Sequence, residues 1–301
     1  MESINLSRER SLYRAAAERS LQAGQHKMAR LQERLSTGLR VNRASDDASA
    51  FAQARKFEGL SDRYAQYLQS IDAANLWTDQ TQDALDGLAE RFTTIYERGI
   101  RARSNVLDAD DRDTQAGLIE DMVDEILDVL NMNEGGEYLF AGTRTTVQPF
   151  DVVAGSVVYN GNTGGRTRQI GDNLRLDINI TGDRILDTGA GYSITDSLQN
   201  LADAIRTNDP AQLDTALDQV ITARDHVIEL GAEAGGIANR LDTAATQLRE
   251  ATLRVDARRS QLEDADLAET IMEFQRAQTD YQAALKVTGS VLQMSLVDFL
   301  R

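Results

Sequence analysis

Small and apolar side chains recur at alternating spacings of three and four residues along two very long stretches of this chain. The first stretch runs from Tyr64 to Val106. The second runs from Leu213 to Leu262, with Arg258 as its one charged interruption. This spacing places the side chains on one face of a helix, and the first helix would be about 65 Å long at ~1.5 Å per residue. A seven-residue repeat kept over such lengths predicts rods that supercoil against partner helices.

The composition agrees with long helices. The 301 residues include two prolines and no cysteine, and 27% are charged while 5% are aromatic. That balance favours helical rods over sandwiches or barrels. Asp209 and Pro210 stand at the start of the second stretch as an expected N-cap and first-turn residue. The absence of cysteine excludes disulfides, thiol catalysis and thiolate metal sites.

The segment between the two rods has a different composition. A short helix is expected from about 114 to 131, ended by Gly135-Gly136, and another is expected over 195–206. Between them glycine, asparagine and β-branched residues accumulate from 143 to 191. Three runs in this segment are strand-like and are separated by turn residues: 156–159, 166–170 and 174–180. We expect a small β domain inserted between helices.

Both ends of the chain carry apolar helix faces. The residues at helix spacing are Ala17, Leu21, Met28, Leu31 and Leu35 near the start, and Leu267, Ile271, Phe274, Tyr281, Leu285, Leu292 and Phe299 near the end. The last stripe does not continue the register of the second rod, so Glu263–Asp266 is predicted to be a joint. Helices of this length bury their apolar faces either on each other or on other subunits.

The sequence therefore predicts a mainly α fold, with long antiparallel coiled-coil helical rods from both chain ends and a small inserted β domain. The predicted parts are an N-terminal assembly helix (1–44), two halves of a helical rod domain (45–142 and 194–262), a small outer β domain (143–193) and a C-terminal assembly helix (263–301).

The formal net charge of -16 argues against nucleic acid as a partner, because a phosphate backbone needs a concentrated basic surface. Residues 1–43 hold nine Arg and Lys against four Asp and Glu, so the acidity belongs to the middle of the chain. The first residues lack an apolar core typical of a cleavable signal peptide, and no stretch predicts a membrane span. We expect neither.

The sequence offers no constellation for catalysis. The two histidines, His26 and His226, both lie inside helix patterns, and no nucleophile, base and orienting group can be grouped around them. The acidic tract Asp108–Asp113 fails as a calcium loop because Ile119 stands at loop position twelve, where glutamate is required. Acids at a helix N-terminus explain the tract better. No catalytic residue, cofactor or metal site is predicted, and the chain is not expected to be an enzyme.

Two terminal segments carry a family resemblance. Leu35–Ala48 reads LSTGLRVNRASDDA, and Leu262–Asp266 reads LEDAD before the last helix. Both resemble the terminal signatures of the flagellin superfamily of bacterial flagellar proteins. The signature residues are Arg40, Asn42, Asp46, Asp47, Asp264 and Asp266.

The middle of the chain resembles one branch of that superfamily. Asn133–Phe150 reads NEGGEYLFAGTRTTVQPF, and it is similar to the hook-associated proteins of the FlgL type. Val158–Asn162, Ile180–Asp183 and the ending Met294–Leu300 are also similar to that branch. Two positions depart from the FlgL pattern: Ala48 stands where many FlgL-type chains have proline, and the Leu39-Arg40 form of the signature is closer to flagellins. A short filament flagellin therefore stays open as an alternative, beside an enzyme on a flagellin-like scaffold and an unrelated coiled-coil scaffold.

The resemblance implies a function. FlgL-type proteins are structural parts of the flagellum and form an adaptor ring at the hook–filament junction, between the FlgK-type protein and flagellin. The implied partners are ring neighbours, a FlgK-like protein, flagellin and a cytoplasmic export chaperone. The implied location is extracellular, reached by type III export without a cleaved signal.

The terminal stripes supply the predicted assembly interface. Its residues are Leu21, Met28, Leu31, Leu35, Phe274, Tyr281, Leu285, Leu292, Met294, Leu296 and Phe299. Because no intramolecular partner for these stripes is evident in the sequence, we expect the isolated monomer to be ordered from about 45 to 262 and mobile at both ends. Folding of the ends would then be coupled to assembly.

Overall fold

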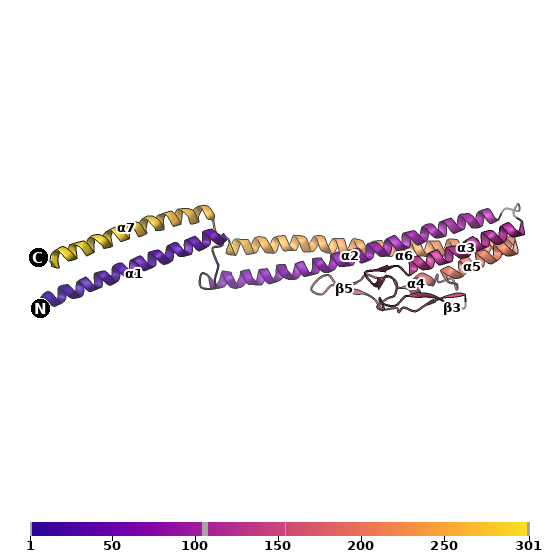
Figure 1. Ribbon diagram of the computed structural model, residues 1–301, viewed down its shortest axis with the longest axis horizontal. Coiled ribbons are helices and arrows are strands. Elements are labelled where there is room, and N and C mark those ends of the chain that lie inside the picture. The colour runs from indigo at the N-terminus through magenta and orange to yellow at the C-terminus, as the bar shows by residue number, and fades with distance from the viewer. Residues whose placement is uncertain (1, 104–107, 154, 300–301) are drawn as a thin grey trace. The chain divides into compact units, whose positions relative to one another are not determined.

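The computed structural model describes residues 2–103, 108–153 and 155–299, with side chains described between residues 15 and 289. Long helices start from both ends, as Figure 1 shows, and this confirms the predicted mainly α fold. The helices are α1 (Glu2–Thr37), α2 (Ala48–Ala102), α3 (Ala109–Leu130), α4 (Gly182–Leu186), α5 (Ile194–Thr207), α6 (Pro210–Glu263) and α7 (Leu267–Phe299).

The chain divides into two compact units. One consists of residues 1–63 and 251–301, and the other of residues 64–250. The division falls inside α2 and α6, whereas the predicted boundaries at 44 and 262 lie at the breaks between α1 and α2 and between α6 and α7. The five-part domain division stays a prediction.

In the unit of residues 64–250, α2 and α6 run antiparallel and side by side (Figure 1). A Cβ added to Gly99 of α2 would lie 2.7 Å from Leu217, and one added to Gly231 of α6 would lie 3.9 Å from Leu85, so residue numbers fall on one helix as they rise on the other. The predicted stripes face this contact. Their fully buried members include Ile71, Leu85, Leu88, Phe92 and Ile95 on α2, and Val220, Ala223 and Leu241 on α6. Val106 lies outside the described residues.

Polar caps set where the helices begin. The Asp209 carboxylate accepts hydrogen bonds from the amides of Ala211 (2.9 Å) and Gln212 (3.3 Å), and α6 starts at Pro210 as predicted. Asp108 caps α3 in the same way by accepting from Asp111 N. Helix α3 therefore begins at Ala109, before the 114 expected from the apolar spacing, and the interpretation of the acidic tract as a helix N-terminus is confirmed.

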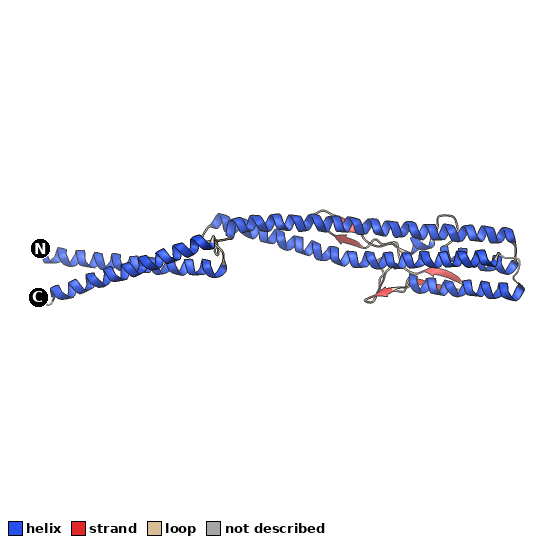
Figure 2. Cartoon of the chain, turned by 90° about the horizontal axis from the view of Figure 1, so that it is seen from above, coloured by secondary structure: helices blue, strands red, loops and turns tan. Residues whose placement is uncertain are grey.

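The inserted segment forms three two-stranded antiparallel sheets, drawn red in Figure 2. The pairs are β1 (Asn133–Glu134) with β2 (Glu137–Tyr138), β3 (Phe150–Val153) with β4 (Ser156–Tyr159), and β5 (Thr167–Gln169) with β6 (Arg175–Asp177). The predicted runs contain β4, β5 and β6. Gly135 and Gly136, both with positive φ, form the turn between β1 and β2 rather than ending α3, which ends at Leu130 with Asn131 as its cap.

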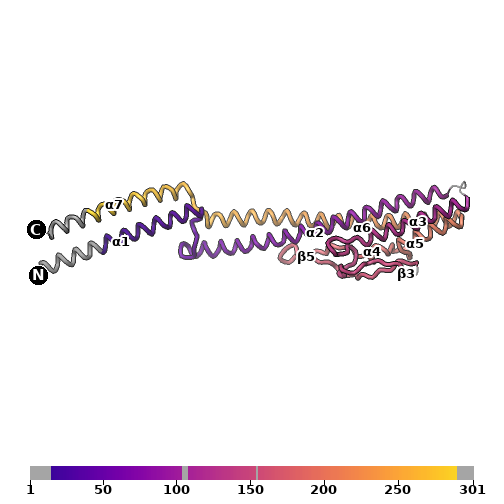
Figure 3. The backbone as a smooth tube through the Cα atoms, in the orientation of Figure 1, coloured from indigo at the N-terminus to yellow at the C-terminus, as the bar shows by residue number. Residues whose placement is uncertain are grey.

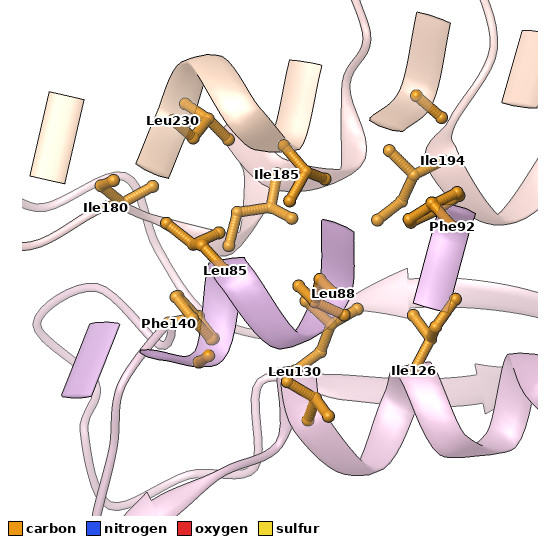
Figure 4. Packing of buried hydrophobic residues seen from close by; sticks show 14 of the residues in the cluster. Leu85, Leu88, Phe92, Ile126, Leu130, Phe140, Ile180, Ile185, Ile194 and Leu230 are labelled. Carbon is orange, nitrogen blue, oxygen red and sulfur yellow. The ribbon is translucent and has the colours of Figure 1, made fainter. Parts of the chain in front are cut away.

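These hairpins pack onto the rods instead of enclosing a core of their own. Phe140, Phe150, Leu176 and Ile180 belong to the same buried cluster as the helices, and Figure 4 shows Phe140 and Ile180 beside Leu85. The predicted β insert is thus a covering layer on the helical unit.

The FlgL-like segment in the middle is hydrogen-bonded to residues before and after it in the chain. Gly182 N donates to Phe140 O (2.9 Å), and the Tyr159 hydroxyl contacts the same carbonyl oxygen at 2.9 Å. Asn131 bonds both backbone groups of Phe150, at 3.0 and 3.1 Å. Residues that are far apart in the sequence thereby share one buried site.

Candidate assembly site

The path from α1 to α2 turns at Gly38. This residue has φ +73, a conformation that favours glycine, and its amide donates to Arg34 O at 2.8 Å, which closes the last turn of α1. Its carbonyl accepts from the amide of Ala265 at 2.9 Å. The break after α1 is therefore hydrogen-bonded to the break before α7, although more than two hundred residues separate them in the sequence.

Further bonds join the same two segments, which we name the joint (residues 38–47 and 262–266). The carbonyl of Glu263 accepts from the amides of Arg40 (2.5 Å) and Val41 (3.3 Å), and Leu39 forms an isolated bridge with Asp264. The Arg40 guanidinium donates to Leu262 O at 2.7 Å and lies 3.7 Å from Asp47. Arg40 thus connects the end of α6 with the start of α2.

The signature residues of the first segment shape its loop. Asp46 accepts from the amides of Asn42 (3.1 Å) and Arg43 (3.0 Å), and the Asn42 side chain donates to Leu39 O (3.0 Å). Asp47 accepts from two amides of the first turn of α2, at 3.1 and 2.9 Å, as an N-cap does.

The signature residues of the second segment act in a similar way. Asp266 accepts from the amides of Ala268 (2.9 Å) and Glu269 (3.1 Å) and caps α7, while Asp264 accepts from the Ser260 hydroxyl. All six signature residues are therefore brought together in the joint. The sequence marked them only as a signature, because no pattern within either segment reveals that the two segments meet.

Helices α1 and α7 lie side by side, and Figure 3 shows them running antiparallel from the joint. Leu31 and Ala277 are each 3% exposed, and Leu21, Met28, Leu35, Phe274 and Tyr281 are half-buried. Tyr281 lies against Gly24 and accepts a hydrogen bond from the Gln25 amide at 2.8 Å. The expectation that the terminal stripes lack an intramolecular partner is therefore wrong, because α1 and α7 pack against each other.

A second apolar face of α7 has no such cover among the described residues. Its members are Leu267 (50% exposed), Ile271 (47%) and Leu285 (45%), which share one side of the helix, whereas Met272 (55%) is exposed on another side. Of the predicted assembly residues with described side chains, only Leu285 lies on this face. Leu267 and Ile271 belong to the predicted C-terminal stripe but were not among the predicted assembly residues. Leu292, Met294, Leu296 and Phe299 lie outside the described side chains.

The part of the chain that the structure describes offers little for small-molecule chemistry. No group of His, Asp and Glu side chains there could hold a metal ion, and none of its helices is long and apolar enough to cross a membrane. One hollow of about 580 Å³ between α5 and α6 is open and lined mainly by polar side chains such as Asn200 and Gln212. His226 Nε2 lies 2.7 Å from Arg184 O and is occupied by that contact.

The carboxyl groups with a lowered pKa belong to ion pairs that join different elements of the fold. Hydrogen bonds from Arg206, Arg166 and Arg184 lower the pKa of Glu120, Glu137 and Glu233, respectively. Arg166 also stacks over Trp77, with its guanidinium carbon 4.0 Å from the ring centre. These contacts support packing of the helical unit.

Known proteins match the chain along most of its length. Hook-associated protein 3 of Escherichia coli strain K12 is 26% identical over 290 residues, which cover 88% of this chain and 90% of that protein. Flagellin FlaB1 of Treponema pallidum is 24% identical over 277 residues, covering 89% and 91%. The solved structure of a flagellar hook-associated protein from Vibrio parahaemolyticus matches with a TM-score of 0.68 and 24% identity, covering 73% of this chain and all of that one.

Family models match both ends of the chain. The bacterial flagellin N-terminal helical region matches residues 11–145, and the bacterial flagellin C-terminal helical region matches residues 216–300. The two regions occur in the expected order and each contains one segment of the joint. The resemblance seen in the sequence is confirmed, and the chain belongs to the bacterial flagellin family.

Proposed function

We propose that this chain is a structural subunit of the bacterial flagellum that forms an adaptor ring at the hook–filament junction. The observation that carries the proposal is the match over nine-tenths of the length of hook-associated protein 3, with the FlgL-like middle segment included. In this chain Phe140 and Phe150 of that segment are fully buried, and the Phe140 carbonyl accepts from the Gly182 amide, so the segment helps to shape the fold.

The exposed face of α7 supplies a means of assembly. Apolar side chains left in water on an isolated chain would be buried between neighbouring subunits, at about 25 cal/mol per Å² before the cost of ordering is subtracted. Ring neighbours are the proposed occupants of this face. The predicted assembly residues Leu292, Met294 and Phe299 are also apolar.

The proposed partners follow from an adaptor role. A FlgK-like protein would contact one side of the ring and flagellin the other, and a chaperone would escort the chain to the flagellar type III export channel. The chain would act outside the cell, without a cleaved signal. The chain would connect these proteins mechanically, in keeping with the structural family to which it belongs.

A short filament flagellin is the second candidate. The Leu39-Arg40 form of the signature and the match to FlaB1 favour it. A filament subunit presents complementary surfaces to copies of itself without limit, whereas an adaptor presents different surfaces to unlike proteins.

Seeded assembly separates the two candidates. Purified protein is incubated with filament seeds under salting-out conditions, which strengthen apolar burial. The adaptor proposal predicts monomers and short oligomers in electron micrographs. Long, regular filaments made of this protein alone would replace the adaptor with the flagellin candidate.

A further inference from the structure

The two faces that α1 and α7 turn toward each other have the same repeat. Among the buried and half-buried positions, those at heptad spacing are Ala17, Leu21, Gly24, Met28, Leu31 and Leu35 on α1, and Thr270, Phe274, Ala277, Tyr281, Ala284 and Thr288 on α7. Both series alternate steps of four and three residues. A pattern that repeats every seven residues is satisfied equally well when one helix slides along the other by seven residues.

One close contact shows which residues of the two helices are level in the observed register. A Cβ added to Gly24 would lie 3.1 Å from the Tyr281 ring, so these two residues are level. Because the helices are antiparallel, Met28 is then level with Ala277 and Leu31 with Phe274. Large side chains of one helix thereby meet mostly smaller ones of the other.

A slide of one heptad keeps this complementarity. In the alternative register Phe274 would meet Gly24, Tyr281 would meet Ala17, and Ala277 would meet Leu21. The hydrogen bond from Gln25 to Tyr281 also has a counterpart, because Glu18 stands seven residues before Gln25 and can accept from the tyrosine hydroxyl. Packing of the two helices therefore gives weak discrimination between the registers.

The hydrogen bonds of the joint, in contrast, can form in only one of the two registers. A slide of seven residues moves one helix by about 10 Å along the other at 1.5 Å per residue. The bonds from Ala265 N to Gly38 O (2.9 Å) and from the Arg40 guanidinium to Leu262 O (2.7 Å) cannot span that shift. Bonds to the carbonyl of Glu263 from the amides of Arg40 and Val41 would break with them.

We infer that the joint is a register clamp: it selects one of two nearly equivalent pairings of α1 with α7. The same α7 face meets α1 in both registers, so the register decides at what height along α1 the exposed α7 side chains lie. The inference rests on the proposed function only for this consequence in assembly. Arg40 is the positioning residue, because its side chain ties the loop after α1 to the last turn of α6.

Paired cysteines can report the register, since the chain has no cysteine of its own. Met28→Cys with Ala277→Cys places the two thiols level in the observed register. Leu21→Cys with Ala277→Cys places them level in the slid register. Each pair is introduced into the full chain and into a clamp variant carrying Arg40→Ala and Ala265→Pro, which remove the guanidinium and one bonded amide. Disulfide formation is measured on purified monomer under mild oxidation.

With the clamp intact, we expect the first pair to cross-link and the second to stay reduced. In the clamp variant the ratio of slid to observed cross-link should rise at least about tenfold, the ratio that corresponds to ~1.4 kcal/mol. Arg43→Ala is the matched control. Its guanidinium bonds Glu33 of α1 at 2.7 Å, so its loss should spare the bonds between the two segments of the joint and leave the ratio unchanged.

An unchanged ratio in the clamp variant would overturn the inference, because packing alone would then set the register. Loss of both cross-links with helix content retained by circular dichroism would also overturn it, since the joint would then be needed for pairing and not for choosing a register. Neither result bears on the junction proposal, because no flagellum is present in the experiment.

Discussion

At the scale of single residues, the inserted hairpins depend on positions where no larger side chain fits. Gly182 is the clearest case, because an added Cβ would lie 2.4 Å from the Phe150 ring and 2.5 Å from the Tyr159 ring. Both rings are held in turn, Phe150 through the Asn131 side chain and Tyr159 through the Phe140 carbonyl. The FlgL-like residues therefore act by packing and backbone bonding.

Replacing Gly182 by Ala should destabilise the unit of residues 64–250 by about 1–3 kcal/mol, because the rings must shift to admit a methyl group. Urea unfolding followed by circular dichroism measures the change. Gly117→Ala in α3 is the control, since no atom lies within 4 Å of its added Cβ and alanine favours a helix by about 0.5–1 kcal/mol. Equal effects of the two substitutions would contradict the packing argument.

The signature residues show what a sequence can and cannot reveal at this scale. The caps by Asp209 and Asp108 were predictable, because an acid before a helix bonds amides only a few residues away. The bond from Arg40 to Leu262 was not, because it joins positions 222 residues apart. The resemblance placed the signature residues at both ends, and only the fold shows that they meet.

At the scale of elements, ion pairs link helices that are distant in sequence. Arg206 of α5 bonds both carboxylate oxygens of Glu120 on α3, at 2.6 and 2.7 Å, and also contacts Asp113 at 3.1 Å. The hydrogen bond from Arg206 lowers the pKa of Glu120. Because the folded pKa lies below the unfolded value of about 4.3, this pair stabilises the fold above that pH and loses its effect as pH falls through the folded pKa.

Glu120→Gln should therefore lower the free energy of unfolding by about 0.5 kcal/mol at pH 7, a small value because the Glu120 side chain is 49% exposed. The difference from the unmodified protein should shrink as pH falls below about 4. Urea midpoints at pH 7 and pH 3 measure it. Asp121→Asn, a neighbouring exposed acid on α3, is the control. A pH-independent difference for Glu120→Gln would show that the charge is not its cause.

The rods were predictable and the strands only partly so. A repeat kept over tens of residues averages out local exceptions, and the stripes on α2 and α6 are buried as expected. Strands β1 and β2 have two residues each, too few to show an alternation, and β3 has one buried residue, Phe150. The partner of the terminal stripes could not be read from the sequence, because a heptad face fits another helix of the chain as well as one of a neighbour.

At the scale of the whole molecule, the chain combines a buried core in residues 64–250 with an exposed apolar face on α7. Truncation after Gly289 should leave that core folded while abolishing incorporation and motility, because it removes the apolar residues Leu292, Met294, Leu296 and Phe299. Thermal unfolding tests the first part, and swimming of a strain with only the truncated copy tests the second. Normal swimming would show that these residues are dispensable for assembly.

The central claim concerns where this subunit sits in a flagellum. The match to hook-associated protein 3 and the FlgL-like buried site favour a single ring between two unlike proteins. Immunogold labelling of isolated flagella, with antibodies raised against the unit of residues 64–250, measures the position directly. The account predicts one band at the distal edge of the hook. Label distributed along the filament would contradict it and identify the chain as a filament flagellin.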